Sequence, residues 1–435
     1  MSRAVTLRGI AALAAVLFAF PAAAQDVLIR GARVHTATAQ GTLENADVLV
    51  RGGTISAVGP GLAAPAGVPV VEAEGRPLTP GLFAGLTALG LEEVSGEPDT
   101  VDNALGFADT HSVEAQWRPE FDVAPAYNPH SAPVAISRVE GLTFTVLAPG
   151  ILPGGSFVSG QGVAVRLDGS FDAALDPSRT LFIQLGSRGK GFAGGSRAGQ
   201  YMLLEQAVRE ARPNAPANLA AMAPSHGLLT PIGRETLARY LRGGRVLFYV
   251  DRAADIRQAL LLAERFGFQP VIAGGAEAWK VADLLAAKRV PVLVDALVNL
   301  PGNFDRLGAR LDNAARLHAA GVPVGFTQSG DATHNARKIR QLAGVAAANG
   351  LPWEAALAGL TRVPAEAFGI ADGLGTIAVG QRADLVLWSG DPLEVTTGAE
   401  QVWLGGRPDS MRSRQTQLRD RYLREDGGWP RAYLK

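Results

Sequence analysis

The chain has 435 residues, enough for a large domain of about 250 residues and a smaller one. Lysine and arginine together number 41, as do aspartate and glutamate, so no net charge directs the protein to nucleic acid or to an anionic membrane. The absence of cysteine excludes disulfide bonds, thiolate nucleophiles, cysteine-ligated zinc and lipid attachment to an N-terminal cysteine.

The first 24 residues have the pattern of a secretory signal peptide. Arg3 and Arg8 give a basic start, and the apolar run 10–20 is too short to span a bilayer comfortably. Three alanines precede Gln25, which predicts cleavage after Ala24; the alternative is an uncleaved anchor. No later apolar run is long enough to be a membrane span. Export without cysteine is typical of a bacterial periplasm, so we expect a periplasmic protein that leaves the membrane after cleavage.

Short strands are predicted at both ends of the mature chain. Residues 27–71 contain three apolar runs separated by Gly-Gly and Gly-Pro breaks, and 375–404 contain a matching set. Each set alone has too few strands to bury a face. We therefore expect one composite β-sandwich domain from residues 25–77 and 373–410, followed by a tail over 411–435.

Between these pieces, residues 78–372 alternate strand-like and helical patterns. The expected strands are 78–90, 142–147, 161–166, 181–185, 245–250, 270–273, 291–295 and 322–327. The expected helices are 197–211, 253–266, 277–288, 305–319 and 334–349. Eight strands with intervening helices predict an α/β fold, a (β/α)₈ TIM barrel whose site lies at the carboxyl ends of the strands. Residues 95–140 are polar and proline-rich, which indicates a long insertion after the first strand.

Two motifs carry a family resemblance. Thr79-Pro80-Gly81-Leu82-Phe83 opens the predicted barrel, and Gly380-Gln381-Arg382-Ala383-Asp384-Leu385-Val386 precedes Gly390-Asp391-Pro392-Leu393 near the end. The mature chain thereby resembles the amidohydrolase superfamily, and in particular its imidazolonepropionase-related and prolidase-like exported members. The resemblance implies hydrolysis of a carbon–nitrogen bond in a cyclic amide or small peptide-like compound. It also implies one or two divalent metal ions, such as zinc, held mainly by histidines.

The residues at the implied metal positions are mostly unable to bind a metal. The strand-1 histidine places hold Leu86 and Ala88, the strand-5 place holds Tyr249, and strand 6 ends Ala273-Gly274-Gly275. The resemblance also implies a carboxylated lysine on strand 4 as a metal ligand, and Lys190, in the glycine-rich turn after that strand, is a candidate for it. The resemblance thus implies a divergent sub-branch without the His-x-His motif, and we assign no metal ligand and no cofactor.

Polar residues after several strands predict a pocket at the barrel mouth. We assign the catalytic place to Asp331, which matches to within two or three residues the aspartate that the resemblance implies after strand 8. The predicted pocket residues are Glu92, Tyr249, Arg252, Asp295, His334 and Arg337. The alternatives are a salt-bridged barrel rim, a helix-terminal contact for His334 and a solvated helix face for Arg337.

Two further motifs are weak. Residues 189–194 spell GxGxxG after a strand, but no acidic strand end follows at the spacing that a dinucleotide site requires, so a loop is favoured. Ser187-x-x-Lys190 lies in a glycine-rich turn instead of at a helix start, which argues against a serine hydrolase.

Two functions remain open. The first is a hydrolase with a degenerate metal site or a metal-free carboxylate pair near Asp331. The second is a non-catalytic relative that binds a small molecule or pairs with an intact paralogue. In either case the partners are a small molecule and a second copy or a paralogue, with no nucleic acid.

Overall fold

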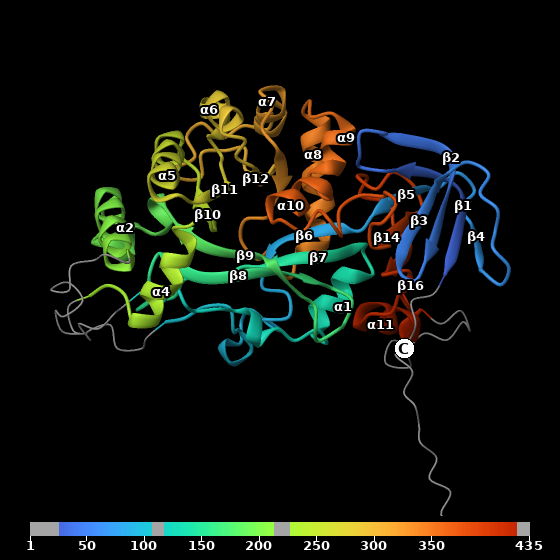
Figure 1. Ribbon diagram of the computed structural model, residues 1–435, viewed down its shortest axis with the longest axis horizontal. Helices are drawn as coiled ribbons and strands as arrows, with labels where there is room; N and C mark the ends of the chain where they lie inside the picture. Colours follow the sequence, from blue (N-terminus) through green and yellow to red (C-terminus); the bar gives the residue numbers. More distant parts are fainter. Residues whose placement is uncertain (1–25, 107–116, 213–226, 424–435) are drawn as a thin grey trace, which may run out of the picture.

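A computed structural model describes residues 26–106, 117–212 and 227–423, and it divides into a β-rich domain and a barrel (Figure 1). The predicted signal peptide, part of the predicted insertion and the end of the tail lie outside the described residues. The fold class is confirmed: the chain is α/β, with an eight-stranded barrel sheet and a β-rich domain to which both ends of the chain contribute.

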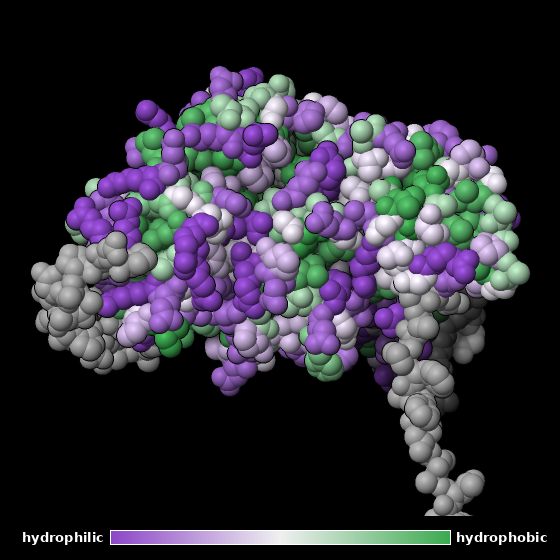
Figure 2. Space-filling view, viewed as in Figure 1, coloured by the Kyte–Doolittle hydropathy of each residue, from purple (hydrophilic) through white to green (hydrophobic). Residues whose placement is uncertain are grey.

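The β-rich domain contains one continuous sheet from both termini. Its strands are β1 (Val27–His35), β2 (Thr42–Arg51), β3 (Thr54–Gly59), β4 (Val70–Glu72), β5 (Pro77–Pro80), β14 (Leu385–Trp388), β15 (Ala399–Leu404) and β16 (Arg407–Pro408). The order is β16-β15-β14-β5-β1-β2-β3, with β4 paired to β1. Alternate residues such as Ile29, Val48 and Leu385 form its buried core. Figure 2 shows apolar side chains gathered over this domain, whereas polar ones cover much of the barrel in the same view.

The barrel sheet begins one residue after β5. Its strands are β6 (Leu82–Thr87), β7 (Leu142–Leu147), β8 (Val158–Arg166), β9 (Ala174–Gln184), β10 (Arg245–Val250), β11 (Gln269–Gly274), β12 (Val292–Val294) and β13 (Val324–Phe326), hydrogen-bonded in that order. Side chains such as Phe83, Phe144, Phe182 and Leu247 fill its interior. The barrel is therefore a packed core and not a pore.

One barrel strand runs against the expected direction. β8 pairs antiparallel with both β7 and β9, whereas the other neighbours are parallel. The connections 148–157 and 167–173 contain no helix. Parallel strands need a crossover of about a dozen residues or more, so these short connections allow only hairpins. The sequence predicted a regular alternation of parallel strands and helices, and this prediction is wrong for β7, β8 and β9, which are joined as hairpins.

The helices lie mainly outside the later barrel strands (Figure 1). They are α1 (Ala132–Arg138), α2 (Arg197–Ala211), α4 (Pro231–Tyr240), α5 (Ala253–Phe266), α6 (Ala282–Ala287), α7 (Asn313–Ala319), α8 (Ile339–Ala348), α9 (Trp353–Ala358), α10 (Arg362–Ala367) and α11 (Arg414–Tyr422). The predicted bounds of α2 and α5 are confirmed. The helix expected over 305–319 begins only at Asn313, because Arg306 and Gly308 before it take part in tertiary contacts. Within the described residues, no helix has the length and apolarity needed to cross a bilayer.

Candidate functional site

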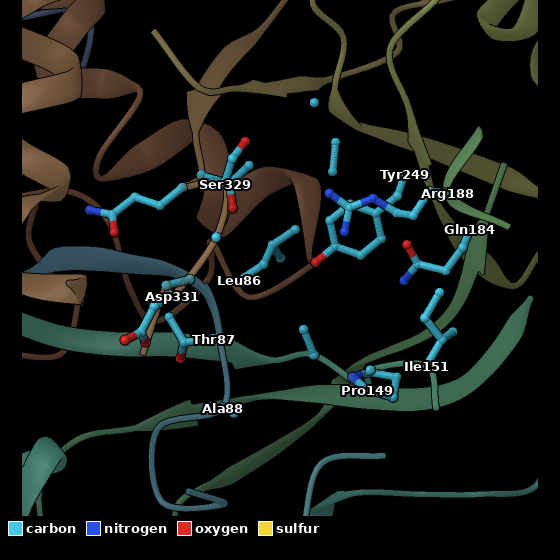
Figure 3. Close-up of a pocket in the computed structure, with 18 of the residues that line it drawn as sticks. Leu86, Thr87, Ala88, Pro149, Ile151, Gln184, Arg188, Tyr249, Ser329 and Asp331 are labelled. Carbon is cyan, nitrogen blue, oxygen red and sulfur yellow. The ribbon is translucent and has the colours of Figure 1, made fainter. Parts of the chain in front are cut away.

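A cavity of about 570 Å³ opens at the carboxyl ends of the parallel barrel strands (Figure 3). Residues at or just after the ends of β6, β7, β9, β10, β11 and β13 line it, and the loop 303–306 closes one side. This is the end of a barrel where functional groups from different strands meet. The cavity therefore lies where the sequence predicted the site.

Aliphatic side chains form part of the cavity wall at the first strand. Leu86 is 3% exposed and belongs to the packed cluster of the barrel interior, together with Ala273 at the end of β11. Ala88 follows with 5% exposure. The apolar core of the barrel thus continues up to the cavity at these strand ends.

Tyr249 is the polar residue at the end of β10. Its ring lies 6.2 Å from the ring of Phe182, and the guanidinium carbon of Arg188 lies 5.1 Å from its centroid. Burial raises the pKa of the Tyr249 hydroxyl to about 12, although the positive charge of Arg188 acts in the opposite direction. At neutral pH the hydroxyl is therefore a neutral hydrogen-bonding group.

The binuclear metal centre implied by the resemblance does not fit these residues. Leu86 and Ala88 offer no ligand atom, and β11 ends in Ala273 and Gly274, which offer none either. Tyr249 would have to lose a proton whose pKa is raised. Zinc-like ions need imidazole, carboxylate or thiolate ligands, so the central positions of the mouth lack a donor set.

A second group of ionisable residues lies at the rim. Glu92, Asp331 and His334 each offer one ligand atom, and these atoms lie within 4.8 Å of one another. His334 Nδ1 is 3.1 Å from Asp331 Oδ1 and 3.7 Å from Glu92 Oε1, separations compatible with one ion about 2.1 Å from each atom. However, His334 Nε2 lies 3.2 Å from the carbonyl oxygen of Glu93, so both ring nitrogens already have polar neighbours.

The electrostatic environment favours a protonated His334. Burial alone would lower the pKa of His334, but the hydrogen bond to Asp331, the Glu93 carbonyl and the charges of Asp331 and Glu92 outweigh it and raise the pKa. The arrangement is a carboxylate–imidazole pair with a second carboxylate beside it. Such a group can hold or transfer a proton at the edge of the cavity.

Ion pairs occupy the opposite part of the rim. Asp251 accepts a 2.8 Å hydrogen bond from Arg306. Asp305 accepts a 2.7 Å bond from the backbone N–H of Ser187 and also pairs with Arg197. Burial opposes ionisation of Asp305, but these hydrogen bonds and charges hold its pKa below the usual range. Both carboxylates are thus neutralised by nearby donors.

The structure brings some predicted site residues together and separates others. Asp331, Glu92 and Tyr249 line the cavity, and His334 contacts the first two. Three others do not line it. Asp295 accepts a 2.8 Å bond from the backbone N–H of Ser329 and so holds the loop after β13, and Arg252 pairs with Asp255 at 2.8 Å where α5 begins. Arg337 is exposed on the short turn before α8.

Gln184, Arg188 and Thr327 line the cavity although the sequence analysis did not single them out. Gln184 ends β9 and Thr327 directly follows β13, so the rule that sites lie at strand ends could have found both. Arg188 lies in the same turn as the weak motifs considered earlier. That turn has a structural reason for its glycine: a Cβ at Gly189 would lie 2.0 Å from the carbonyl oxygen of Gln184.

Comparisons with known proteins agree with this architecture. The amidohydrolase family profile matches residues 247–409. An imidazolonepropionase of Maricaulis maris is 31% identical over 180 residues, 40% of this chain and 41% of that protein. The amidohydrolase tasK of Hapsidospora irregularis is 47% identical over 57 residues, 13% of this chain and 6% of that protein. This chain therefore spans less than half the length of either curated relative.

The structural match is broader. The crystal structure of an amidohydrolase from Thermotoga maritima superposes with a TM-score of 0.74 at 25% identity, covering 88% of this chain and 99% of that one. Profile, curated relatives and fold point to the same group of proteins, and the profile match runs from β10 of the barrel to the C-terminal strands of the β-rich domain. The chain belongs to the amidohydrolase superfamily.

Proposed function

We propose that this chain is an exported member of the superfamily that binds a small molecule in the barrel mouth, without the binuclear metal chemistry of a carbon–nitrogen hydrolase. One observation carries the proposal: Leu86 and Ala273 extend the packed barrel interior into places where the resemblance implies metal ligands, yet a cavity of about 570 Å³ remains above them. A volume of that size accommodates a small ligand. Loss of the ligands with retention of the pocket supports binding more than hydrolysis.

A second candidate function rests on the rim group. The 3.1 Å contact between His334 and Asp331, with Glu92 at 3.7 Å, supports a hydrolase that transfers protons through this pair. The raised pKa of His334 favours the protonated imidazole that a general acid requires. This candidate requires activity that depends on His334.

Metal analysis of the mature protein tests whether the binuclear metal chemistry is absent, and an assay for hydrolysis tests the second candidate. We expect protein purified without chelator and dialysed to hold far less than one zinc, manganese or iron ion per chain, because the central strand ends supply no ligands. N-terminal sequencing of the same sample tests export, with Gln25 expected first. A thermal-shift screen of small polar compounds then identifies ligands through an increase in melting temperature.

One ion per chain retained through dialysis, together with hydrolysis of amide substrates, would overturn the binding proposal. If hydrolysis is found without metal, His334→Gln should abolish it under the second candidate. His318→Gln is the matched control, since His318 is exposed on α7 and does not line the cavity.

A further inference from the structure

We propose that the ligand is an elongated molecule with a carboxylate at one end and a cationic hydrogen-bond donor, such as an ammonium group, at the other. Arg188 pairs with the carboxylate, and Glu92 and Asp331 face the cationic end. This inference rests on the proposed binding function and names its ligand class. It follows from how charge is distributed over the cavity.

Arg188 is an arginine of the cavity whose guanidinium is not neutralised. Within the described part of the chain, no carboxylate oxygen lies within 4.0 Å of it, whereas Arg306 and Arg197 each pair with a cavity-side aspartate. Instead, Arg188 lies over the ring of Tyr249 at 5.1 Å (Figure 3). A planar guanidinium held on an aromatic face keeps its N–H groups free for a carboxylate.

The turn that carries Arg188 is held in place. Its neighbour Ser187 donates its backbone N–H to Asp305 at 2.7 Å and accepts a 3.1 Å bond from Arg197 through its hydroxyl. Gly186 has φ +68°, a conformation that favours glycine, and its missing Cβ would lie 2.8 Å from Asp305 Oδ2. The anion-binding group is therefore positioned before a ligand arrives, which reduces the entropy lost on binding.

Gln184 supplies an independent sign of a missing partner. The residue is 3% exposed, and its side-chain oxygen has no hydrogen-bond partner among the described residues. Figure 3 shows its amide beside Arg188 and directed into the cavity. Buried amides in folded proteins are nearly always hydrogen-bonded. The unpartnered oxygen is an acceptor, as a carboxylate is, so the two cannot pair directly. Rotation of the amide by 180° exchanges this oxygen for an N–H group, and Gln184 can then donate to a carboxylate that Arg188 holds.

The other side of the cavity has the opposite charge. Asp331 lies across from Arg188, with Leu86 between them in Figure 3. Glu92 is 11% exposed at its side chain, and its Oε1 lies 3.7 Å from His334 Nδ1. Two carboxylates against one imidazole leave this end negative at neutral pH, even when His334 is protonated. A ligand whose only charge is a carboxylate would be repelled at this end. A ligand with a carboxylate at one end and a cationic group at the other complements both ends of the cavity.

Isothermal titration with a matched series tests the inference. The probes are 4-aminobutyrate, 6-aminohexanoate and 8-aminooctanoate, with hexanoate and hexylamine as single-charge comparisons. We expect at least one amino acid of the series to bind wild-type protein about tenfold or more tightly than either single-charge compound. Arg188→Gln should weaken that binding about tenfold or more. Arg188→Lys should weaken it less, because lysine keeps the positive charge but cannot donate two parallel N–H groups to one carboxylate.

Arg257→Gln is the matched control, since it removes the same charge from an exposed arginine on α5 outside the cavity and should leave the affinity unchanged. Equal affinity in wild type and Arg188→Gln, or no binding by any member of the series, would overturn the inference. If neutral compounds from the thermal-shift screen bind while the series does not, the ligand class is wrong and the binding function stands. Metal-dependent hydrolysis would instead remove the binding function itself.

Discussion

Tyr249 illustrates how one residue limits the chemistry of this barrel mouth. An imidazole at the end of β10 would offer a lone pair to a metal at neutral pH. The phenol that occurs here has a pKa raised to about 12 by burial, and its ring packs between Phe182 and Arg188. Its role in the cavity is therefore to support the guanidinium and to offer a neutral hydroxyl.

His334 gives a pH-dependent prediction at the same scale. Its pKa in the folded protein is raised above 6.5, because Asp331, the Glu93 carbonyl and Glu92 outweigh the effect of burial. The stabilisation is therefore fully present below pH 6.5 and is lost as pH rises through the folded-state pKa. The side chain is 34% exposed, so the loss in His334→Gln should stay below about 1 kcal/mol.

Urea unfolding of wild type and His334→Gln between pH 5.5 and 9 measures this difference. The gap in free energy of unfolding should be largest at pH 5.5 and shrink toward pH 9. His318→Gln, on the exposed face of α7, is the matched control for the loss of an imidazole. A gap that grows with pH would contradict the assignment.

At the scale of elements, the sequence predicted strand and helix positions better than strand direction. The 3.6-residue period of AADIRQALLLAERF reproduces α5, and the apolar run RVLFYV reproduces β10. The direction of β8 was missed, because an alternating strand has the same pattern whichever way it runs. The short connections on either side of β8 carried that information and indicated hairpins.

The same reasoning explains which site residues could be predicted. Tyr249 lies near the end of β10, and Glu92 and Asp331 lie in the loops after β6 and β13, so the rule that sites form at strand ends placed them at the cavity. Asp295 directly follows β12, but its carboxylate accepts a hydrogen bond from the backbone N–H of Ser329. The direction in which the Asp295 side chain points depends on the geometry of the neighbouring loops, and the residue pattern of a single sequence does not predict that geometry.

Trp388 on β14 gives a prediction about how the two parts of the fold are joined. Its side chain is fully buried, donates a 2.9 Å bond to Thr79 Oγ1 on β5, and lies 4.8 Å from the guanidinium of Arg340 on α8. Trp388→Ala should lower the free energy of unfolding by about 3–5 kcal/mol, because a large cavity replaces the ring. Chemical denaturation followed by circular dichroism measures the change.

Thr79→Val separates the hydrogen bond from the packing. It removes the acceptor of the Trp388 N–H with little change of volume, so it should cost about 1–3 kcal/mol. Trp388→Phe should lower the free energy of unfolding by more than Thr79→Val and by less than Trp388→Ala. A loss in Thr79→Val as large as that in Trp388→Ala would show that packing is not the main contribution.

At the scale of the whole molecule, the C-terminal strands contribute to both cores at once. On β14, Leu385 and Leu387 belong to the core of the β-rich domain, whereas Val386 and Trp388 belong to the cluster outside the barrel. This alternation follows from the two-residue period of a strand. One short strand therefore couples two hydrophobic cores that are far apart in the sequence.

We therefore expect the folded chain to unfold in one cooperative transition. Trp388 of β14 and Val402 of β15 belong to the cluster outside the barrel, so loss of the β-rich domain would expose the barrel side chains of that cluster, and neither part should persist alone. Differential scanning calorimetry should show one peak whose calorimetric and van't Hoff enthalpies agree. Trp388→Ala should shift that peak to lower temperature without splitting it. Two resolved peaks in the wild type would mean that the β-rich domain and the barrel are independent, and the shared strands would then be a contact surface between them and not a common core.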